Sequence, residues 1–366
     1  MKIGIPRALL YSIYLPLWKT FFEELGHDVV LSSKTNQDIL NSGVKNCVDD
    51  ACLPVKIFHG HVMDLAGKVD MILIPRLISV HPGEFICPKF IGLPEMIKND
   101  LPSISNLLVL DFNAHGRAEK AYDGMKKLGR ELGASLSLIH SSLKKAQLRQ
   151  EDYKNMLENG SSPQDLLDIR RDNYIAKEAY SNMGIYYKRG LELRETDQSK
   201  DAEANPTKGM IGLIGHPYLV YDTYINMNIC RKLKVSGYEI VYPENCGLEE
   251  IDRACARYPK KLFWSYGKRL LGSGLSMMRD RRIQGLILIT SFACGIDAFI
   301  DELLIRANNR EFLLPLTTLT LDEHTGEAGF DTRLEAFIDM MEWRNKYDNH
   351  FSPHGSGIYS GQGIVR

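Results

Sequence analysis

Three cysteines in this sequence share one local pattern and could together bind a metal: Cys52, Cys87 and Cys294. Each precedes a stretch whose apolar residues recur at helical spacing. The first two are followed within two residues by a proline, which is favoured in the first turn of a helix. Each thiol should therefore lie at a helix N-terminus, where free N–H groups and the helix dipole favour anions. We expect this setting to lower the thiol pKa and to suit a metal-bound thiolate. The alternative is that these cysteines are small hydrophobic residues of the core.

Cys294 has the most specific surroundings of the three. The run from Gly285 to Ile289 is unbroken and apolar, the pattern of a strand buried on both faces of a parallel sheet. Apolar residues recur at helical spacing after it. Cys294 should therefore lie where a central strand passes into a helix, at the crevice in which open α/β sheets bind ligands. Gly295 would let the backbone approach the occupant of that crevice.

The elements that must position these cysteines alternate between strand and helix patterns. This alternation predicts an α/β fold with doubly wound parallel sheets. The strands expected in the first half are residues 2–6, 27–31, 69–75 and 107–110, with helices at 9–25, 49–66, 87–97 and 118–132. The strands expected in the second half are residues 210–214, 238–242, 262–266, 286–290 and 312–316.

The predicted domain organisation has four parts. They are an N-terminal α/β domain with Cys52 and Cys87 (1–139), a helical connector and linker (140–208), a C-terminal α/β domain with Cys294 (209–348) and a loosely ordered tail (349–366). The connector is predicted from polar stretches with helical spacing. Its end, residues 195–208, is dense in charge and poor in apolar residues, so we expect it to be flexible.

Composition and charge exclude several classes of function. The chain has 366 residues, of which 25% are charged and 44% apolar, and a formal net charge of -1. This balance gives no reason to expect nucleic acid or an anionic membrane surface as a partner. No apolar run is long enough to cross a bilayer, and no secretory signal is visible. Seven widely spaced cysteines do not resemble a secreted disulfide framework. The expectation is a cytoplasmic protein with reduced or metal-bound thiols.

The remaining motifs favour structural roles. No phosphate-binding loop is present, and Gly272-Ser273-Gly274 is interpreted as an ordinary turn, so the chain is not expected to hydrolyse ATP. His59 and His61 lie two residues apart and cannot share a helix face; we interpret them as surface residues. The other cysteines are expected to be a spare thiol, a core residue, a loop residue and a helix residue, respectively Cys47, Cys230, Cys246 and Cys255.

A late loop is rich in ionisable groups. Residues 321–330 follow a predicted strand and carry three carboxylates and a histidine. Such a loop at the carboxyl end of a strand could supply acid–base groups, and the candidate catalytic residues are His324 and Glu327. Thr332 and Glu335 have the spacing of a capping box at the next helix. The alternative is a solvated loop that only caps this helix.

Seven motifs together resemble a known family. They are residues 2–7 (KIGIPR), 52–56 (CLPVK), 60–62 (GHV), 87–94 (CPKFIGLP), 215–218 (GHPY), 294–297 (CGID) and 323–327 (EHTGE). The sequence resembles the activase-associated branch of the 2-hydroxyacyl-CoA dehydratase superfamily, which includes benzoyl-CoA reductase-type subunits and double-cubane cluster proteins. The resemblance extends from Met1 to about Trp343.

The resemblance implies two flavodoxin-like domains with an iron–sulfur cluster between them, held by Cys52, Cys87 and Cys294. Thiolates are the ligands such clusters require. The cofactor implied is a 4Fe–4S cluster, with an 8Fe–9S double cubane as the variant. A separate ATP-dependent activase would deliver a low-potential electron, and the family reduces or dehydrates a small molecule such as an acyl-CoA. Homodimers or dimers with a related dehydratase subunit are the implied assemblies.

Three functions remain open from the sequence. The first is an iron–sulfur dehydratase or reductase subunit that a partner activates with ATP. The second is a non-catalytic iron–sulfur carrier or assembly partner. The third is a metal-free module that binds a small molecule between the domains.

Overall fold

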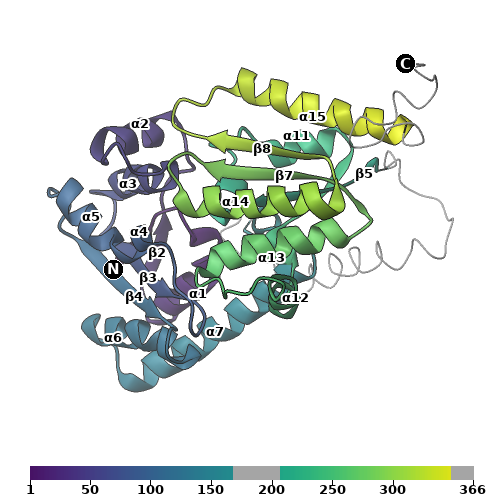
Figure 1. Cartoon of the computed structure of the whole chain (residues 1–366). Coiled ribbons are helices and arrows are strands. Elements are labelled where there is room, and N and C mark those ends of the chain that lie inside the picture. The colour runs from purple at the N-terminus through teal and green to yellow at the C-terminus, as the bar shows by residue number, and fades with distance from the viewer. Residues whose placement is uncertain (168–206, 348–366) are drawn as a thin grey trace, which may run out of the picture.

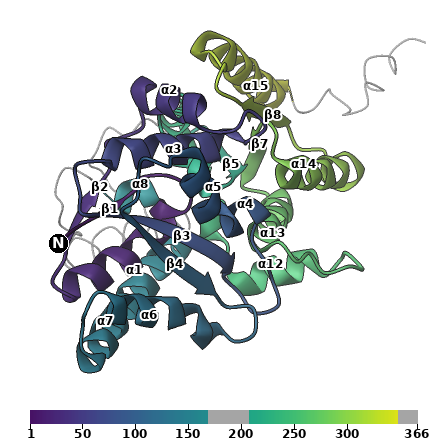
Figure 2. The same ribbon diagram turned by 90° about the vertical axis from the view of Figure 1, so that its left-hand side faces the viewer.

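The computed structural model describes residues 1–167 and 207–347 and contains two four-stranded parallel sheets flanked by helices (Figure 1). The strands of the first sheet are β1 (Lys2–Ile5), β2 (Asp28–Leu31), β3 (Met71–Ser79) and β4 (Leu107–Asn113), in the order β2-β1-β3-β4. Its helices are α1 (Tyr11–Glu24), α2 (Gln37–Asn46), α3 (Leu53–Leu65), α4 (Pro88–Ile91), α5 (Leu93–Asp100) and α6 (Asp123–Glu131), with a 3-10 turn η1 (Ala118–Tyr122). In Figure 2, α1, α6 and α7 lie on one side of this sheet and α2 and α3 on the other.

The second sheet repeats this arrangement. Its strands are β5 (Gly209–Gly215), β6 (Tyr238–Val241), β7 (Ile283–Ser291) and β8 (Leu316–Leu321), in the order β6-β5-β7-β8. Its helices are α10 (Pro217–Val220), α11 (Ile229–Val235), α12 (Leu248–Cys255), α13 (Ser265–Arg279), α14 (Gly295–Ala307) and α15 (Glu327–Tyr347), with short helical turns η3 (Pro243–Asn245) and η4 (Asn308–Phe312). Both sheets therefore have the doubly wound order, and the predicted fold class of two flavodoxin-like α/β units is confirmed.

The order of the strands defines a crevice in each sheet. In each half the chain runs from the first strand to an edge strand, and then crosses back to the other side of the first strand. The two crossover connections diverge between the first and third strands, and this topological switch point is where open α/β sheets bind ligands. The relevant crevices therefore lie beyond the carboxyl ends of β1 and β3, and of β5 and β7.

Part of the predicted helical connector is present as α7 (Leu136–Glu158) and α8 (Pro163–Leu166). α7 packs along α1 and also contacts η3 of the second half. Its Tyr153 is fully buried and donates a hydrogen bond to the Ser12 carbonyl. The connector therefore touches both halves. The rest of the predicted linker up to residue 206, and the predicted tail at 349–366, fall outside the described residues.

Four local predictions were wrong. Residues 262–266 are not a strand: Trp264 makes only an isolated bridge with Phe85, and α13 starts at Ser265. The last strand begins at Leu316 and not at 312, because η4 occupies the preceding residues. Residues 272–274 lie inside α13, where the glycines accommodate Ile251 and Leu304 and make no turn. Thr332 does not cap α15, which begins at Glu327.

Two further differences concern helices of the first half. The sequence did not predict α2, and the helix expected at 87–97 is divided into α4 and α5.

One hydrophobic cluster spans both halves. It includes Ile5 and Ile74 of the first sheet together with Ile211 and Ile289 of the second. The halves are also joined through their backbones, because the amide of Phe85 donates to the Phe263 carbonyl at 2.6 Å and Ser265 donates to Phe85 at 2.9 Å. Burial of apolar surface is the main favourable term in folding. The two crevices are therefore held against each other by a shared core.

Candidate metal centre between the two sheets

Each of the three predicted cysteines is the N-cap residue of a helix: Cys52 of α3, Cys87 of α4 and Cys294 of α14. The prediction that each thiol precedes a helix start is therefore confirmed. Backbone N–H groups of the following turn act to lower the pKa of each thiol; they belong to Val55, to Lys89 and Phe90, and to Asp297, respectively. Such groups can satisfy a sulfur that carries negative charge.

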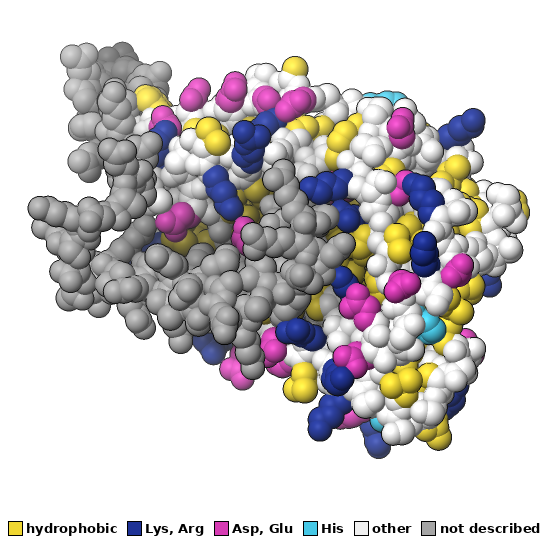
Figure 3. Space-filling model, turned by 180° about the vertical axis from the view of Figure 1, so that it is seen from behind, with side chains coloured by type: hydrophobic (Ala, Val, Ile, Leu, Met, Phe, Trp, Pro, Cys, Tyr) yellow, Lys and Arg dark blue, Asp and Glu magenta, His cyan; other side chains and the backbone are white. Residues whose placement is uncertain are grey.

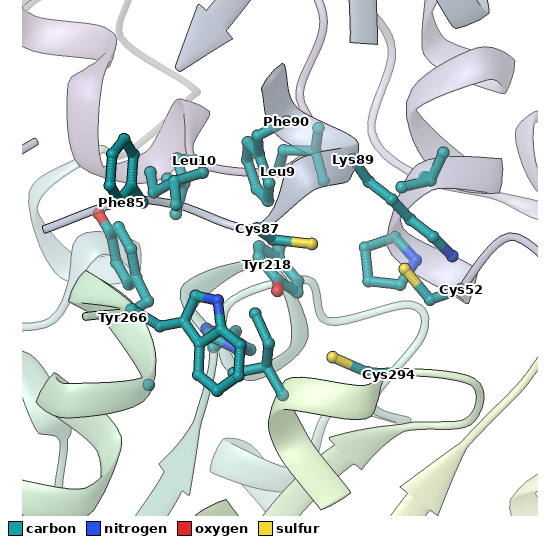
Figure 4. A pocket seen from close by; sticks show the side chains of 17 residues that line it. Leu9, Leu10, Cys52, Phe85, Cys87, Lys89, Phe90, Tyr218, Tyr266 and Cys294 are labelled. Atoms are coloured by element: carbon teal, nitrogen blue, oxygen red, sulfur yellow. The ribbon is translucent and has the colours of Figure 1, made fainter. Parts of the chain in front are cut away.

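All three cysteines line one cavity. Figure 4 shows their sulfur atoms directed into a common space, with the Tyr218 side chain between Cys87 and Cys294. The space within its walls that no atom fills is about 510 Å³, including the part that opens to solvent. The lining is mainly apolar or aromatic, including Leu9, Leu10, Phe90, Trp264 and Tyr266. The structure thus brings together cysteines that lie far apart in the sequence.

The topology explains why two of the three thiols, Cys87 and Cys294, meet. Cys87 follows β3 and Cys294 follows β7, so each comes after the third strand of its own sheet. Leu9 follows β1 and His216 follows β5, the first strands. These four residues belong to the two switch-point crevices, and all four line the cavity. The two crevices therefore face each other across one cavity.

The turn before Cys294 has an unusual backbone. Ala293 has a φ of 63°, in the left-handed region that non-glycine residues seldom adopt. The Cys294 amide donates to the Ser291 carbonyl at 3.1 Å, which closes a tight turn between β7 and α14. Leu9, at the cavity wall, has a φ of 54°. Strained residues concentrate at binding and catalytic sites, and here one of them directs a candidate ligand.

The expectation of lowered thiol pKa values was wrong. Burial raises the pKa of Cys52, Cys87 and Cys294, and the negative charge of Asp297 adds to the effect for Cys294. The N–H donors and the Lys89 ammonium act in the opposite direction on Cys52 and Cys87 but do not outweigh burial. Desolvation penalises the charged form of a buried thiol. Three thiolates in this cavity therefore require a positively charged occupant, as a metal centre would provide.

A buried acid–base pair lies at the wall of this cavity, where His216 lines it and Asp297 lies behind His216. His216 Nε2 lies 2.8 Å from Asp297 Oδ1, and both side chains are about 95% buried or more. The Ser291 amide donates to Asp297 Oδ2 at 3.1 Å. Burial alone would raise the pKa of Asp297, but the His216 charge and the hydrogen bonds together hold it below its usual range. Nδ1 of His216 has no hydrogen-bond partner among the described residues. Each residue lies within a motif that follows a strand, His216 after β5 and Asp297 after β7, and this placement is the sequence signal for the pair.

Tyr218 lies close to both the His216–Asp297 pair and the three thiols. Its ring stacks on His216, with the ring centroids 4.9 Å apart. Its pKa is raised well above the usual value by burial first, and then by the charges of Asp297 and the three cysteines. His216, Cys294 and Asp297 also offer ligand atoms within 4.8 Å of one another. The phenol therefore remains protonated and faces the thiols as a neutral donor.

The predicted catalytic residues lie elsewhere. His324 and Glu327 are exposed and are not among the residues that line the cavity. Glu327 begins α15 and forms an ion pair with Lys232 at 2.7 Å. From the same loop, Glu323 forms an ion pair with the buried Lys56 of α3 at 2.5 Å. This loop thus links the two halves, and catalysis by His324 and Glu327 stays a prediction.

The interpretation of His59 and His61 as surface residues was wrong, since both are fully buried. Nδ1 of His61 lies 2.8 Å from the Ser32 hydroxyl, and Nε2 lies 3.1 Å from that of Thr35. Burial lowers the pKa of His61 to about 3. Thr35 in turn donates to Asp222 of the second half at 2.5 Å. His61 is therefore neutral, with its proton on Nε2, and takes part in a hydrogen-bonded chain between the halves.

The other cysteines lie outside the cavity. Cys230 is a buried residue of α11, as predicted, and Cys255 is the last residue of α12. Cys246 is buried in the loop before α12 and packs in the core of the second half. Burial raises its pKa to about 12. These thiols have the surroundings of packing residues.

A second cavity adjoins the first at Tyr266, which lines both. Its unfilled space is about 950 Å³, including the part open to solvent, and its walls come from both halves and from α7. Glu244 and Ser265 line it; both are 6% exposed, and Glu244 Oε1 and the Ser265 hydroxyl make no hydrogen bond within the described residues. Buried polar atoms usually have partners. This cavity therefore offers polar groups to a small molecule.

Charged side chains of both signs are mixed on one face of the molecule. On the face seen in Figure 3, acidic and basic side chains are interspersed over the described part of the surface. Among the described helices, none has the length and apolar character that crossing a bilayer requires.

Comparison with known proteins identifies a family. A family model described as a CoA enzyme activase uncharacterised domain matches residues 2–246, more than half of the chain. The match agrees with the resemblance to the activase-associated branch. It includes Cys52, Cys87 and His216, whereas Cys294 and Asp297 lie beyond its end. No curated protein matches the chain.

Proposed function

Since the chain belongs to the family of CoA enzyme activase uncharacterised domains, we propose that it is an iron–sulfur redox protein served by a separate activase. Its cluster is bound through the thiolates of Cys52, Cys87 and Cys294. Its substrate is a small molecule that is reduced or dehydrated, with an acyl-CoA as the first candidate.

The observation that carries this proposal is the convergence of three N-cap thiols on one cavity. Thiolates are the usual ligands of iron–sulfur clusters. Helix N-termini and the Lys89 ammonium offset negative charge at Cys52 and Cys87. The chemistry of the donor set therefore fits a 4Fe–4S cluster, in which three protein ligands leave one iron open. When bound, such a cluster would supply one electron at low potential.

The cavity also contains groups that could manage a proton. His216 and Asp297 form a buried pair at 2.8 Å, and Tyr218 stacks on the imidazole. A histidine held by a carboxylate is a common proton donor in enzymes. In this proposal, His216 donates a proton to the substrate as it accepts the electron, and Asp297 orients the imidazole.

The second cavity favours an enzyme over a simple carrier. It shares Tyr266 with the thiol cavity and offers two buried atoms that make no hydrogen bond within the described residues, Glu244 Oε1 and the Ser265 hydroxyl. A substrate seated there would reach the thiol cavity past a single tyrosine. Polar groups in a ligand site fix the orientation of the ligand, and the walls of this cavity combine aromatic side chains with several charged ones.

An activase partner follows from the family description and from the lack of a phosphate-binding loop. The partner would hydrolyse ATP and deliver the electron. The purified chain should therefore show no ATP hydrolysis above background. ATP hydrolysis by the chain alone that persists after further purification would overturn the separate-activase proposal.

The decisive experiment is anaerobic purification followed by iron and sulfide analysis. We expect roughly four iron and four sulfide per chain, and a paramagnetic resonance signal after reduction. Roughly eight iron would indicate the double-cubane variant instead. A colourless protein without iron or sulfide after anaerobic reconstitution would refute the cluster.

A second candidate, a non-catalytic cluster carrier, has one observation in its favour. Phe263 and Phe299, each about half exposed, pack around Trp264, which lines the thiol cavity. Exposed aromatic groups favour a protein partner. Turnover of an acyl-CoA with an activase and ATP distinguishes the two functions, because a carrier gives none and instead transfers iron to an apoprotein.

A further inference from the structure

A second group of ligand-type side chains lies outside the three-cysteine cavity. Ligand atoms of Cys47, His59 and Asp100 all lie within 4.8 Å of one another. Cys47 is 8% exposed and His59 is fully buried, whereas the Asp100 side chain is 18% exposed. They come from three places: the end of α2, the middle of α3 and the end of α5. None of them lines the cavity described above.

The two nitrogens of His59 both face acceptors. Nδ1 lies 2.8 Å from the Val55 carbonyl oxygen, one turn earlier in α3. A carbonyl only accepts, so Nδ1 carries a proton. Nε2 lies 3.0 Å from Asp100 Oδ2. In the neutral imidazole, Nε2 would then direct a lone pair at a carboxylate, so a positive species must lie between them. That species is either a second proton or a metal ion.

Cys47 distinguishes these alternatives. An imidazolium–carboxylate pair needs no third group, yet a thiol also lies in this buried cluster. Metal-binding histidines typically donate the other ring N–H to a carbonyl or carboxylate, as His59 does to Val55. A thiolate beside the imidazole and the carboxylate would give a divalent ion three protein ligands.

We propose that Cys47, His59 and Asp100 bind a single divalent metal of the zinc type. Sulfur, nitrogen and oxygen ligands in one site are characteristic of zinc. Zinc–ligand bonds of about 2.0–2.3 Å place tetrahedral ligand atoms roughly 3.5 Å apart, so side-chain shifts of about 1 Å complete the site. The partial exposure of Asp100 leaves an entry path from solvent, and a water from that side would complete the four ligands. A thiolate and a carboxylate neutralise the charge of the metal.

Such a metal would brace the segment that carries Cys52. Only the short turn between α2 and α3 separates Cys47 from Cys52, and both belong to the same small apolar cluster with Ala51 and Val55. The metal would tie the start of that turn to α5. Its role is structural, and the site stands independently of any cluster bound by Cys52.

The test uses the full chain, stripped of zinc with a chelator and then titrated with Zn²⁺ or Co²⁺. We expect one tightly bound zinc per chain, and for Co²⁺ the absorption of a tetrahedral ion with a thiolate charge-transfer band. The variants are Cys47→Ala and Asp100→Asn, which should weaken zinc affinity by about 10-fold or more. The matched control is Cys255→Ala, which removes another partly buried thiol and should leave affinity unchanged.

Several results would overturn this site. Absence of zinc binding by the wild-type chain would leave only a proton between His59 and Asp100. A thiolate band that persists in Cys47→Ala would place the metal on other cysteines. A Cys294→Ser chain should still bind its zinc, so this measurement separates the site from the proposed cluster. If Cys47→Ala does not fold by circular dichroism, the Asp100→Asn titration decides the question alone.

Discussion

The two halves of this molecule have the same strand order but bring different chemistry to the cavity between them. The first half contributes Cys52 and Cys87 with the Lys89 ammonium, and the second contributes Cys294 with the His216–Asp297 pair. Cys87 and Cys294 are topological counterparts, since each follows the third strand and caps the next helix. The first half is thus equipped mainly to bind a metal, and the second half also to handle protons.

The counterpart of Cys52 sharpens this difference. Cys52 caps α3, the second helix between the second and third strands of its sheet, and Trp264 caps α13, the second helix of the same connection in the second half. Both residues line the shared cavity, so the second half has an indole where the first half has a thiol. A common topology therefore provides equivalent positions, and the side chain at each position decides what chemistry it brings to the site.

The largest expected effect comes from replacing one thiol in each half. Serine at Cys87 or Cys294 should lower iron content after anaerobic reconstitution by more than half, because a hard hydroxyl ligand replaces a thiolate. Serine at Cys246, a buried thiol of the second half outside the cavity, should leave iron and the absorption spectrum unchanged. Full iron content in Cys294→Ser would break the comparison, since the second half would then supply no ligand.

The next largest effect concerns the acid–base pair of the second half. In iron-free protein, Asp297→Asn should lower the free energy of unfolding by about 3 kcal/mol at neutral pH, because it removes a buried carboxylate that is paired with His216 and hydrogen-bonded to the Ser291 amide. The folded-state pKa of Asp297 is lowered, so its stabilising contribution is present above its unfolded value of about 3.9. That contribution is lost as the pH falls through the lowered pKa of Asp297 in the folded protein. At that pH the free energies of unfolding of the wild-type protein and of Asp297→Asn should converge. Urea titrations measure this, with the exposed Glu302→Gln on the same helix as control.

A smaller effect is expected from His61 in the first half. Its folded-state pKa of about 3 lies below the unfolded value of about 6.5, so the unfolded chain binds the proton first. The contribution of neutral His61 to the free energy of unfolding should be fully present above pH 6.5. It should fall as the medium is acidified, by about 2 kcal/mol between pH 7 and pH 5. His61→Gln should reduce this pH dependence. If the free energy of unfolding depended on pH equally in the wild-type protein and in His61→Gln, His61 would already be charged in the folded state.

The smallest effect is expected at the surface of the second half. Glu327→Gln removes an ion pair with Lys232 in which the carboxylate is 66% exposed. Exposed pairs contribute little, so the free energy of unfolding should change by less than about 0.5 kcal/mol. Activity measured on the same variant tests its predicted catalytic role separately. A loss of stability above 2 kcal/mol would mean that the loop linking the halves depends on this residue.

The sequence was sufficient where local signals decide the structure. The apolar run before Cys294 and the prolines after Cys52 and Cys87 are local, and the strand ends and helix starts lie where they indicate. The aromatic run at 262–266 misled the strand prediction, because Trp264 packs against residues from both halves. These local patterns place the candidate ligands on the right elements without showing their distances.

The burial of His59 and His61 could not be read from local spacing. Their partners, Asp100 for one and Ser32 and Thr35 for the other, come from different elements. The His216–Asp297 pair also joins residues from two distant stretches. Contacts of this kind depend on the tertiary arrangement. The thiol pKa values were misjudged for the same reason, because burial depends on the packing of both halves.

The hydrophobic cluster that runs through both halves has a consequence for the order of assembly. Because it joins residues such as Ile5 and Ile289 without any metal, the spacing of Cys87 and Cys294 is set before an inorganic centre arrives. A zinc finger, by contrast, acquires its fold only when its ion binds. The polypeptide should therefore mature in two stages: the apoprotein folds cooperatively, and iron and sulfide then bind in a cavity that is already formed.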